Sequence, residues 1–204
     1  MADRFVAVSG NIGAGKTSLV RYLTERYGVQ PIYEPFGDNP YLDDFYGDMP
    51  RWAFHSQVFF LGRKYKLHQQ VDASAGTFVM DRTMYEDAEI FAAYLARSHR
   101  MTPRDHATYL ELYDSLKRSI RPPDVLLHLR CSVSATRRRI RKRGRANEQQ
   151  IPLAYLRSLH GLYEEWIAGW KDSPVVVWDS ERLDYLEDLV DQLEFHRTVE
   201  RFLR

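Results

Sequence analysis

The segment of residues 10–17, GNIGAGKT, matches the pattern G-x-x-x-x-G-K-[ST] at every position. An apolar run at residues 4–9 precedes it, and a helical pattern begins at Lys16. In this strand–loop–helix order the glycines let successive backbone N–H groups face phosphate oxygens, and the helix N-terminus adds a positive partial charge. The third glycine of a dinucleotide-binding G-x-G-x-x-G is absent. The segment therefore predicts an α/β fold that binds a nucleoside triphosphate, rather than a glycine-rich turn that binds nothing.

Short apolar runs alternate with longer helical patterns along the chain. We expect strands at residues 4–9, 31–33, 77–80, 125–129 and 175–178, and helices at about 16–27, 50–73, 84–97, 103–120, 133–142, 152–171 and from 183 to the C-terminus. The strands are apolar at nearly every position, which is typical of strands covered on both faces. No repeat or Gly/Ser-rich linker divides the 204 residues. The pattern predicts one α/β domain over residues 1–204, with a five-stranded parallel sheet flanked by helices on both faces.

The composition is that of an ordinary globular protein. Hydrophobic residues make up 44% and charged residues 28%, which excludes a disordered chain. With 29 Lys and Arg against 28 Asp and Glu, the overall charge gives no reason to expect nucleic acid or an anionic membrane as a partner. A single cysteine, Cys131, excludes an intramolecular disulfide, and no apolar run reaches the roughly 18 residues of a membrane span. Because the first apolar run leaves no room for a signal peptide, we expect a cytoplasmic protein.

Polar side chains at two strand ends indicate a phosphoryl-transfer site. Lys16 would contact the β- and γ-phosphates and Thr17 would bind Mg²⁺. Glu34 follows the second strand and could accept the proton of an attacking hydroxyl, although a solvated loop acid would read the same way. Asp81 follows the third strand and suits a second Mg²⁺ anchor, with Arg82 beside it; the alternative is a helix N-cap with its ion pair. The guanine-reading N-K-x-D of GTPases is absent, so a small-molecule kinase is favoured.

A basic run of seven Lys and Arg residues without an acid occupies residues 137–145. Arg139 and Arg143 lie four residues apart, on one helical face, and Arg145 follows Gly144, a possible hinge. Forked guanidinium groups suit phosphate oxygens. We therefore expect an arginine-rich lid at about residues 137–150 that closes over ATP, while a solvated helix face or a nucleic-acid contact surface are the alternatives.

Taken together, these features resemble the deoxyribonucleoside kinase family, and especially its bacterial deoxyadenosine/deoxyguanosine kinase branch. The resemblance extends from the phosphate loop to about Trp166. It rests on the order and spacing of Glu34-Pro35, Asn39-Pro40-Tyr41, Trp52 with Gln57, Asp81-Arg82-Thr83 with Asp87, and Arg143-Gly144-Arg145 before Glu148 and Ile151-Pro152-Leu153.

The resemblance implies ATP-dependent phosphorylation of the 5′-hydroxyl of a deoxyribonucleoside, with Mg²⁺ as cofactor. It makes Glu34, Arg82 and Lys16 the catalytic residues, and Thr17, Glu34 and Asp81 the metal-binding residues. The residues expected to bind the ATP phosphates are Gly10, Asn11, Ile12, Gly13, Ala14, Gly15, Lys16, Thr17, Ser18, Arg139, Arg143 and Arg145.

The resemblance also assigns residues to the nucleoside, besides Glu34 and Arg82. Tyr46 and Glu148 match the pair that holds the sugar 3′-hydroxyl, and Gln57 matches the amide that binds the base. Trp52 matches an aromatic wall of the pocket and Phe91 the ring that stacks on the base. Asp87 matches a position that is acidic in cytosine- and purine-preferring members, with Lys64 in place of its usual arginine partner. The resemblance favours a purine deoxyribonucleoside, deoxyadenosine or deoxyguanosine, and argues against a thymidine specialist, while deoxycytidine stays open as the pyrimidine alternative.

Two other functions compete with this hypothesis. Thymidylate kinase shares the phosphate loop, an acid before proline and a D-R pair, but phosphorylates a monophosphate. The second alternative is a regulatory module that binds a nucleoside triphosphate without turning it over. The residues after Asp179 match the family poorly, so no contacts to the adenine of ATP are assigned. Family members are commonly dimers, and the helical patterns at 50–73 and 84–97 could supply the dimer face.

Overall fold

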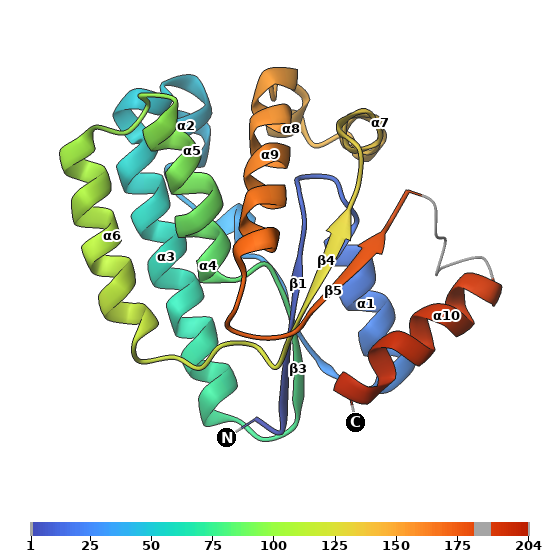
Figure 1. Cartoon of the computed structure of the whole chain (residues 1–204). Helices are drawn as coiled ribbons and strands as arrows, with labels where there is room; N and C mark the ends of the chain where they lie inside the picture. Colours follow the sequence, from blue (N-terminus) through green and yellow to red (C-terminus); the bar gives the residue numbers. More distant parts are fainter. Residues whose placement is uncertain (1, 182–188, 204) are drawn as a thin grey trace.

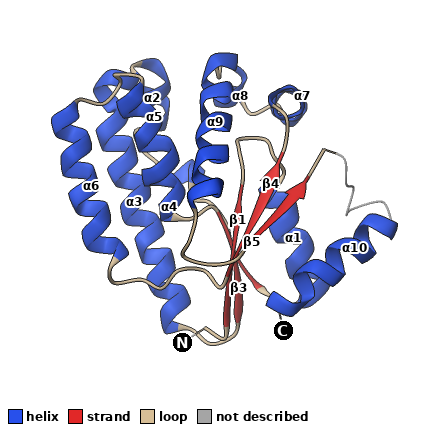
Figure 2. Cartoon of the chain, viewed as in Figure 1, coloured by secondary structure: helices blue, strands red, loops and turns tan. Residues whose placement is uncertain are grey.

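The core of the molecule is a sheet of five parallel strands (Figures 1 and 2). The computed structural model describes residues 2–181 and 189–203. The strands are β1 (Arg4–Ser9), β2 (Gln30–Ile32), β3 (Thr77–Asp81), β4 (Val125–Arg130) and β5 (Val175–Asp179), in the spatial order β2-β3-β1-β4-β5. This confirms the expected α/β sheet, with β2 displaced by one residue toward the N-terminus.

Helices cover both faces of the sheet (Figure 1). One face carries α1 (Lys16–Tyr27) and α10 (Leu189–Val199). The other carries α3 (Met49–Ala73), α4 (Met84–Glu86), α5 (Ala93–Arg97), α6 (Pro103–Lys117) and α9 (Leu153–Gly169). Helix α7 (Val133–Arg143) lies beyond the carboxyl end of β4.

The alternation of side chains along each strand explains the two layers. Val6 and Val8 of β1 pack with apolar residues of α1 and α10, whereas Ala7 between them belongs to the cluster on the opposite face. On β4, Leu126 packs on the same face as Ala7, and Leu127 packs on the face of α1 and α10. Both faces of these two central strands are therefore buried, as their continuously apolar sequences predict.

The described helices differ from the expected ones at several points. The expected helix at 84–97 contains a π-helical turn, Asp87–Ala92, between α4 and α5. Helices α6 and α9 end two to three residues earlier than expected, and three short helices were not expected. The last expected helix starts at 183, outside the described residues, and is described from Leu189 onward. The short helices are the 3₁₀ turn Phe36–Asp38, α2 (Leu42–Gly47) and α8 (Ala146–Gln149).

The described part of the chain contains no helix long and apolar enough to cross a membrane. Its longest helix, α3, buries polar side chains along its length, among them Ser56, Gln57 and Lys64.

Candidate active site

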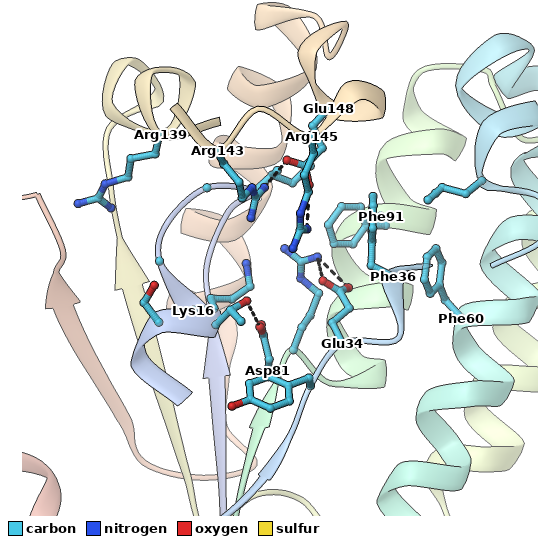
Figure 3. Close-up of a pocket in the computed structure, with 18 of the residues that line it drawn as sticks. Lys16, Glu34, Phe36, Phe60, Asp81, Phe91, Arg139, Arg143, Arg145 and Glu148 are labelled. Atoms are coloured by element: carbon cyan, nitrogen blue, oxygen red, sulfur yellow. Dashed lines mark hydrogen bonds and ion pairs between the residues drawn. The ribbon is translucent and has the colours of Figure 1, made fainter. Parts of the chain in front are cut away.

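A cavity of about 810 Å³ opens at the carboxyl ends of the strands. Its walls come from the loops that follow β1, β2 and β3, from α3, and from the segment around α7 and α8 (Figure 3). Because these strands are parallel, segments distant in the sequence end at this one edge, where ligands of α/β proteins bind. The cavity therefore gathers most of the residues that the sequence predicted.

The phosphate loop depends on glycines that no other residue could replace. Gly10 and Gly13 have φ values of +144° and +80°, in the region that favours glycine. A Cβ on Gly10 would lie 2.7 Å from the carbonyl oxygen of Leu129, and one on Gly13 would lie 2.9 Å from that of Thr136. The loop must therefore be bare of side chains at these points, which leaves its backbone N–H groups open to a phosphate.

Lys16 lies inside the loop that it is expected to serve. Its Nζ donates to the carbonyl oxygens of Gly10 at 2.9 Å and Asn11 at 3.1 Å. Burial, together with the positive charge of Arg82, lowers the pKa of Lys16 to about 8. The negative phosphates of a bound nucleotide would favour the protonated form of Lys16. Nucleotide binding would therefore keep Lys16 positively charged, as phosphate binding requires.

Thr17 and Asp81 meet at the end of the phosphate loop. The Thr17 hydroxyl donates to Asp81 Oδ2 at 2.6 Å, and Asp81 Oδ1 is buried without a hydrogen-bond partner among the residues described. A hydroxyl and a carboxylate are hard oxygen donors that fit Mg²⁺, which usually takes one or two carboxylates and completes its shell with water and phosphate oxygens. The described residues hold no cluster of three His, Cys, Asp or Glu side chains that could bind a metal ion.

Glu34 lies between two buried cations, Arg82 and Lys64. Both of its carboxylate oxygens accept from Arg82 Nη1 at 2.9 Å, and its Oε1 lies 3.3 Å from Lys64 Nζ. Although burial alone would raise it, the charges of Arg82 and Lys64 lower the pKa of Glu34 to about 2. The carboxylate is therefore ionised at any physiological pH and can accept a hydrogen bond from a hydroxyl in the cavity.

The three arginines expected in the lid have different partners. Arg143 and Arg145 both pair with Glu148, the latter at 3.3 Å from Oε1 (Figure 3). Arg139 donates instead to the carbonyl oxygen of Ala14 at 3.0 Å and to Ser180 Oγ at 3.1 Å. Arg139 thus ties α7 to the phosphate loop, while the other two arginines gather on a carboxylate predicted to bind the sugar.

The end of the cavity away from the phosphate loop suits a nucleobase. Gln57, Asp87 and Phe91 line it, as the resemblance implied. Gln57 Oε1 and Asp87 Oδ2 are buried and accept no hydrogen bond from any described residue. Lys64 Nζ lies 2.8 Å from Asp87 Oδ1, so the predicted replacement of an arginine by Lys64 is present as an ion pair. The two free acceptor oxygens require donors that a nucleobase could supply.

Tyr46 also lines the cavity. Its pKa is raised by burial and by the negative charge of Glu148, which places the two members of the predicted sugar pair in one electrostatic environment.

Trp52 is one predicted site residue that the cavity does not include. Its ring stacks on Tyr41, with centroids 5.6 Å apart and planes inclined at 27°. Asn11 also turns away, since its side chain donates to the carbonyl oxygen of Leu156 at 3.0 Å. Gly10 and Ala14 do not line the cavity either, whereas Ile12, Gly13, Gly15, Lys16, Thr17 and Ser18 do.

Sequence reasoning missed several aromatic residues of the cavity. Phe36, Phe60 and Tyr155 line it. Phe60 lies three residues after Gln57, on the same helical face, and Phe36 comes two residues after Glu34, so their positions carried a signal. Tyr155 reaches the cavity from α9 and had no such signal.

Comparison with known proteins agrees with this geometry. The model of the deoxynucleoside kinase family matches residues 6–204. The chain is 36% identical over 199 residues to a deoxyadenosine/deoxycytidine kinase of Bacillus subtilis, covering 94% of this chain and 92% of that protein. It is 34% identical over 197 residues to a deoxyguanosine kinase of Lactobacillus acidophilus, covering 92% and 85%.

Solved structures show the same likeness. The structure of deoxyadenosine kinase from M. mycoides with bound dATP aligns with a TM-score of 0.84 at 28% identity, over 97% of this chain and 99% of that one. The match to the family model spans nearly the whole chain, including every residue of the cavity described above. The chain therefore belongs to the deoxynucleoside kinase family.

Proposed function

We propose that this enzyme transfers the γ-phosphoryl group of ATP to the 5′-hydroxyl of a purine deoxyribonucleoside, with deoxyadenosine as the preferred substrate. The observation that carries the proposal is the ionised Glu34, which faces the same cavity as the phosphate loop and is held by Arg82 through two contacts of 2.9 Å. A nucleoside whose base lies against Gln57 and Phe91 would have its sugar between these residues and Glu34.

The reaction needs positioning and charge compensation more than covalent chemistry by the protein. The 5′-oxygen bonds to the γ-phosphorus, the bond from that phosphorus to the β,γ-bridging oxygen breaks, and ADP leaves. Glu34 orients the hydroxyl and accepts its proton as the new bond forms. Arg82, Lys16 and the lid arginines would offset the charge on the transferring group.

Mg²⁺ is part of the proposal. Thr17 and the unpartnered oxygen of Asp81 would hold it, and it would supply positive charge beside the phosphates. Glu34 is the weakest of the three predicted metal-binding residues, because Arg82 and Lys64 already occupy its oxygens.

The choice of base rests on the acceptors at the end of the cavity. Gln57 Oε1 and Asp87 Oδ2 both require a donor. Adenine has its donors on the exocyclic amino group at C6, where guanine has a carbonyl oxygen and donates from N1 and N2 instead, so the preference depends on the acceptors facing C6. Cytosine also presents an amino group, so deoxycytidine is the expected second substrate, whereas thymidine offers a carbonyl oxygen at that position. Relatives named for deoxyadenosine and deoxycytidine agree with this order, and another relative of similar identity is named for deoxyguanosine.

Turnover of Glu34→Gln tests the assignment. The variant keeps the size of the side chain and loses the charge, so we expect ATP and deoxyadenosine to bind normally by calorimetry while kcat falls at least about a hundredfold. The matched control is Glu89→Gln, which lies outside the cavity and contacts Trp166, and which should retain kcat. Full turnover by Glu34→Gln would refute the role of the carboxylate.

A substrate panel tests the acceptor. The wild-type enzyme would be offered the four deoxynucleosides, the corresponding ribonucleosides and dTMP, each with ATP. We expect deoxyadenosine to have the highest kcat/KM, followed by deoxycytidine. Preferred turnover of dTMP would identify a thymidylate kinase, and ATP binding without any transfer would identify a regulatory module.

We further propose that residues 1–204 act as one domain with a lid at about 137–150, and that the enzyme is a cytoplasmic homodimer. The resemblance to the family supports the dimer, and the single buried Cys131 suits a reducing compartment. Multi-angle light scattering tests the dimer through the mass in solution.

A further inference from the structure

A second buried carboxylate, Glu86, lies beside the active-site arginine. It is fully buried and does not line the cavity. Its Oε2 accepts from the backbone N–H of Thr83 at 2.9 Å, and its Oε1 accepts from the Tyr163 hydroxyl at 3.0 Å. Oε1 also lies 3.6 Å from Nε of Arg82. Arg82 is therefore placed between two carboxylates, Glu34 in the cavity and Glu86 outside it.

Arg82 has an unusual backbone conformation that needs such support. Its φ of 64° lies in the left-handed region, which non-glycine residues rarely adopt and which is strained for arginine. The backbone N–H of Arg82 donates to the carbonyl oxygen of Val8 at 3.0 Å, and its Nη2 donates to that of Gly10 at 3.3 Å. These contacts, together with those to Glu34, direct the two terminal nitrogens toward the cavity and the phosphate loop.

The remaining nitrogen of the guanidinium depends on Glu86. Arg82 Nε is buried and has no hydrogen-bond partner in the described structure, so the anion at 3.6 Å is its compensating group. The ring of Phe91 covers the guanidinium at 4.7 Å from its centroid. Without the charge of Glu86, the attraction that keeps Nε on this side would be lost, and the guanidinium would be free to tilt away from Glu34.

We propose that Glu86 is a positioning residue for phosphoryl transfer, which acts by fixing the orientation of Arg82. This inference rests on the proposed function, because it concerns the arginine that holds the candidate base. Tyr163 on α9 orients the carboxylate in turn, so a helix that follows the lid in sequence supports the catalytic arginine from outside the cavity. A purely structural role, capping of α4 through Thr83, predicts lost stability without a specific effect on turnover.

Steady-state kinetics of Glu86→Gln distinguish these roles. The amide retains the size of the side chain and can still accept from Tyr163, but it has no charge to offer Arg82. We expect kcat to fall about tenfold or more, with KM for ATP and deoxyadenosine changed less than about twofold, because the loss concerns the transition state. Glu86→Asp keeps the charge and should recover part of kcat.

The matched control is Glu89→Gln. Glu89 lies on the same segment and binds α9 in a similar way, through Trp166 Nε1 at 2.7 Å, but it does not contact Arg82. This variant should match the wild-type kcat. If Glu86→Gln does not fold, Tyr163→Phe leaves the charge in place and removes one hydrogen bond that orients it, and should lower kcat less severely with KM unchanged.

A double-mutant cycle with Arg82→Lys provides the decisive measurement. If Glu86 acts through Arg82, Glu86→Gln will lower the residual kcat of Arg82→Lys far less than it lowers that of the wild type. Additive losses, or a wild-type kcat for Glu86→Gln, would overturn the inference. These outcomes leave the proposed function standing, whereas failure of the wild-type enzyme to phosphorylate any deoxynucleoside would refute that function directly.

Discussion

Acidic side chains of the same type acquire different chemistry around this cavity, because each has different neighbours. Burial raises the pKa of Glu86 to about 7 and that of Asp87 to about 6, despite the cations beside them, so the charge that Glu86 offers Arg82 is complete only above about pH 7. Glu34 is partly buried as well, yet two contacts to Arg82 and one to Lys64 lower its pKa to about 2. The candidate base is thus the most firmly ionised of the three, which suits a group that must orient a hydroxyl.

Two buried histidines make stability depend on pH. Burial lowers the pKa of His68 and of His128 to about 3, so both are neutral in the folded state down to acidic pH. In the unfolded chain they bind protons below about pH 6.5, which favours unfolding as the pH falls. We expect the free energy of unfolding to decrease between about pH 6.5 and 3, by up to about 1.4 kcal/mol per pH unit for each histidine.

Urea unfolding of His128→Asn from pH 4 to 8 measures this effect. An asparagine can retain the 2.8 Å contact that His128 Nδ1 makes with Ser9 Oγ, while it removes the titration. The variant should lose stability less steeply than the wild type below pH 6.5 and show the same dependence above it. An unchanged slope would show that His128 is protonated equally easily in both states.

At the scale of single elements, glycine has two opposite roles. In the phosphate loop Gly13 has a positive φ, and Ile140 and Thr136 of α7 leave no room for a Cβ. In α9, Gly161 is exposed and has nothing within 4 Å of where its Cβ would be. The first glycine is needed for the backbone conformation, and the second only weakens a helix.

Alanine at Gly161 should therefore stabilise the fold, whereas alanine at Gly13 should impair ATP binding. Gly161→Ala should raise the free energy of unfolding by about 0.5–1 kcal/mol, because glycine is a poor helix former, and leave kcat unchanged. Gly13→Ala should lower ATP affinity by strain in the loop. Thermal denaturation and ATP titration of both variants provide the measurements, and equal ATP affinity of the two would contradict the role given to Gly13.

On the scale of the whole molecule, part of the apolar core that stabilises the fold lies away from the candidate active site. The cavity lies at the carboxyl ends of the strands, whereas α10 packs over α1 and the sheet on one face (Figure 1). Phe195 of α10 is buried, with its ring 5.0 Å from that of Trp178 and perpendicular to it. The C-terminal helix thus contributes apolar burial without supplying a group to the cavity.

Phe195→Ala should destabilise the protein without altering its chemistry. Removal of a buried phenylalanine costs about 3–5 kcal/mol through lost burial and the cavity left behind. We expect a lower denaturation midpoint in urea, with kcat and KM of the folded enzyme within about twofold of wild type at low temperature. A selective loss of kcat in a fully folded variant would show that α10 is coupled to the site.

Much of the fold and part of the site could be predicted from local patterns. The five strands and the start of α1 follow from apolar periodicity and from the phosphate-loop motif, which depend on neighbouring residues alone. The π-helical turn at Asp87–Ala92 could not be predicted in this way, because its sequence is compatible with an uninterrupted helix. Trp52 was assigned to the pocket by resemblance and packs on Tyr41 instead, since its environment depends on how α2 meets α3.

The sequence by itself determined the phosphate loop, the alternation that makes a parallel sheet, and the meeting of Glu34 with Asp81 and Arg82 at one edge, because parallel strands end on the same side. Only the tertiary structure decided which charges pair. Lys64 contacts both Glu34 and Asp87. Glu86 accepts a hydrogen bond from the hydroxyl of Tyr163, which is 77 residues away in the chain. Buried charges select partners by distance in space, and that distance is set by how helices pack, which no local pattern encodes.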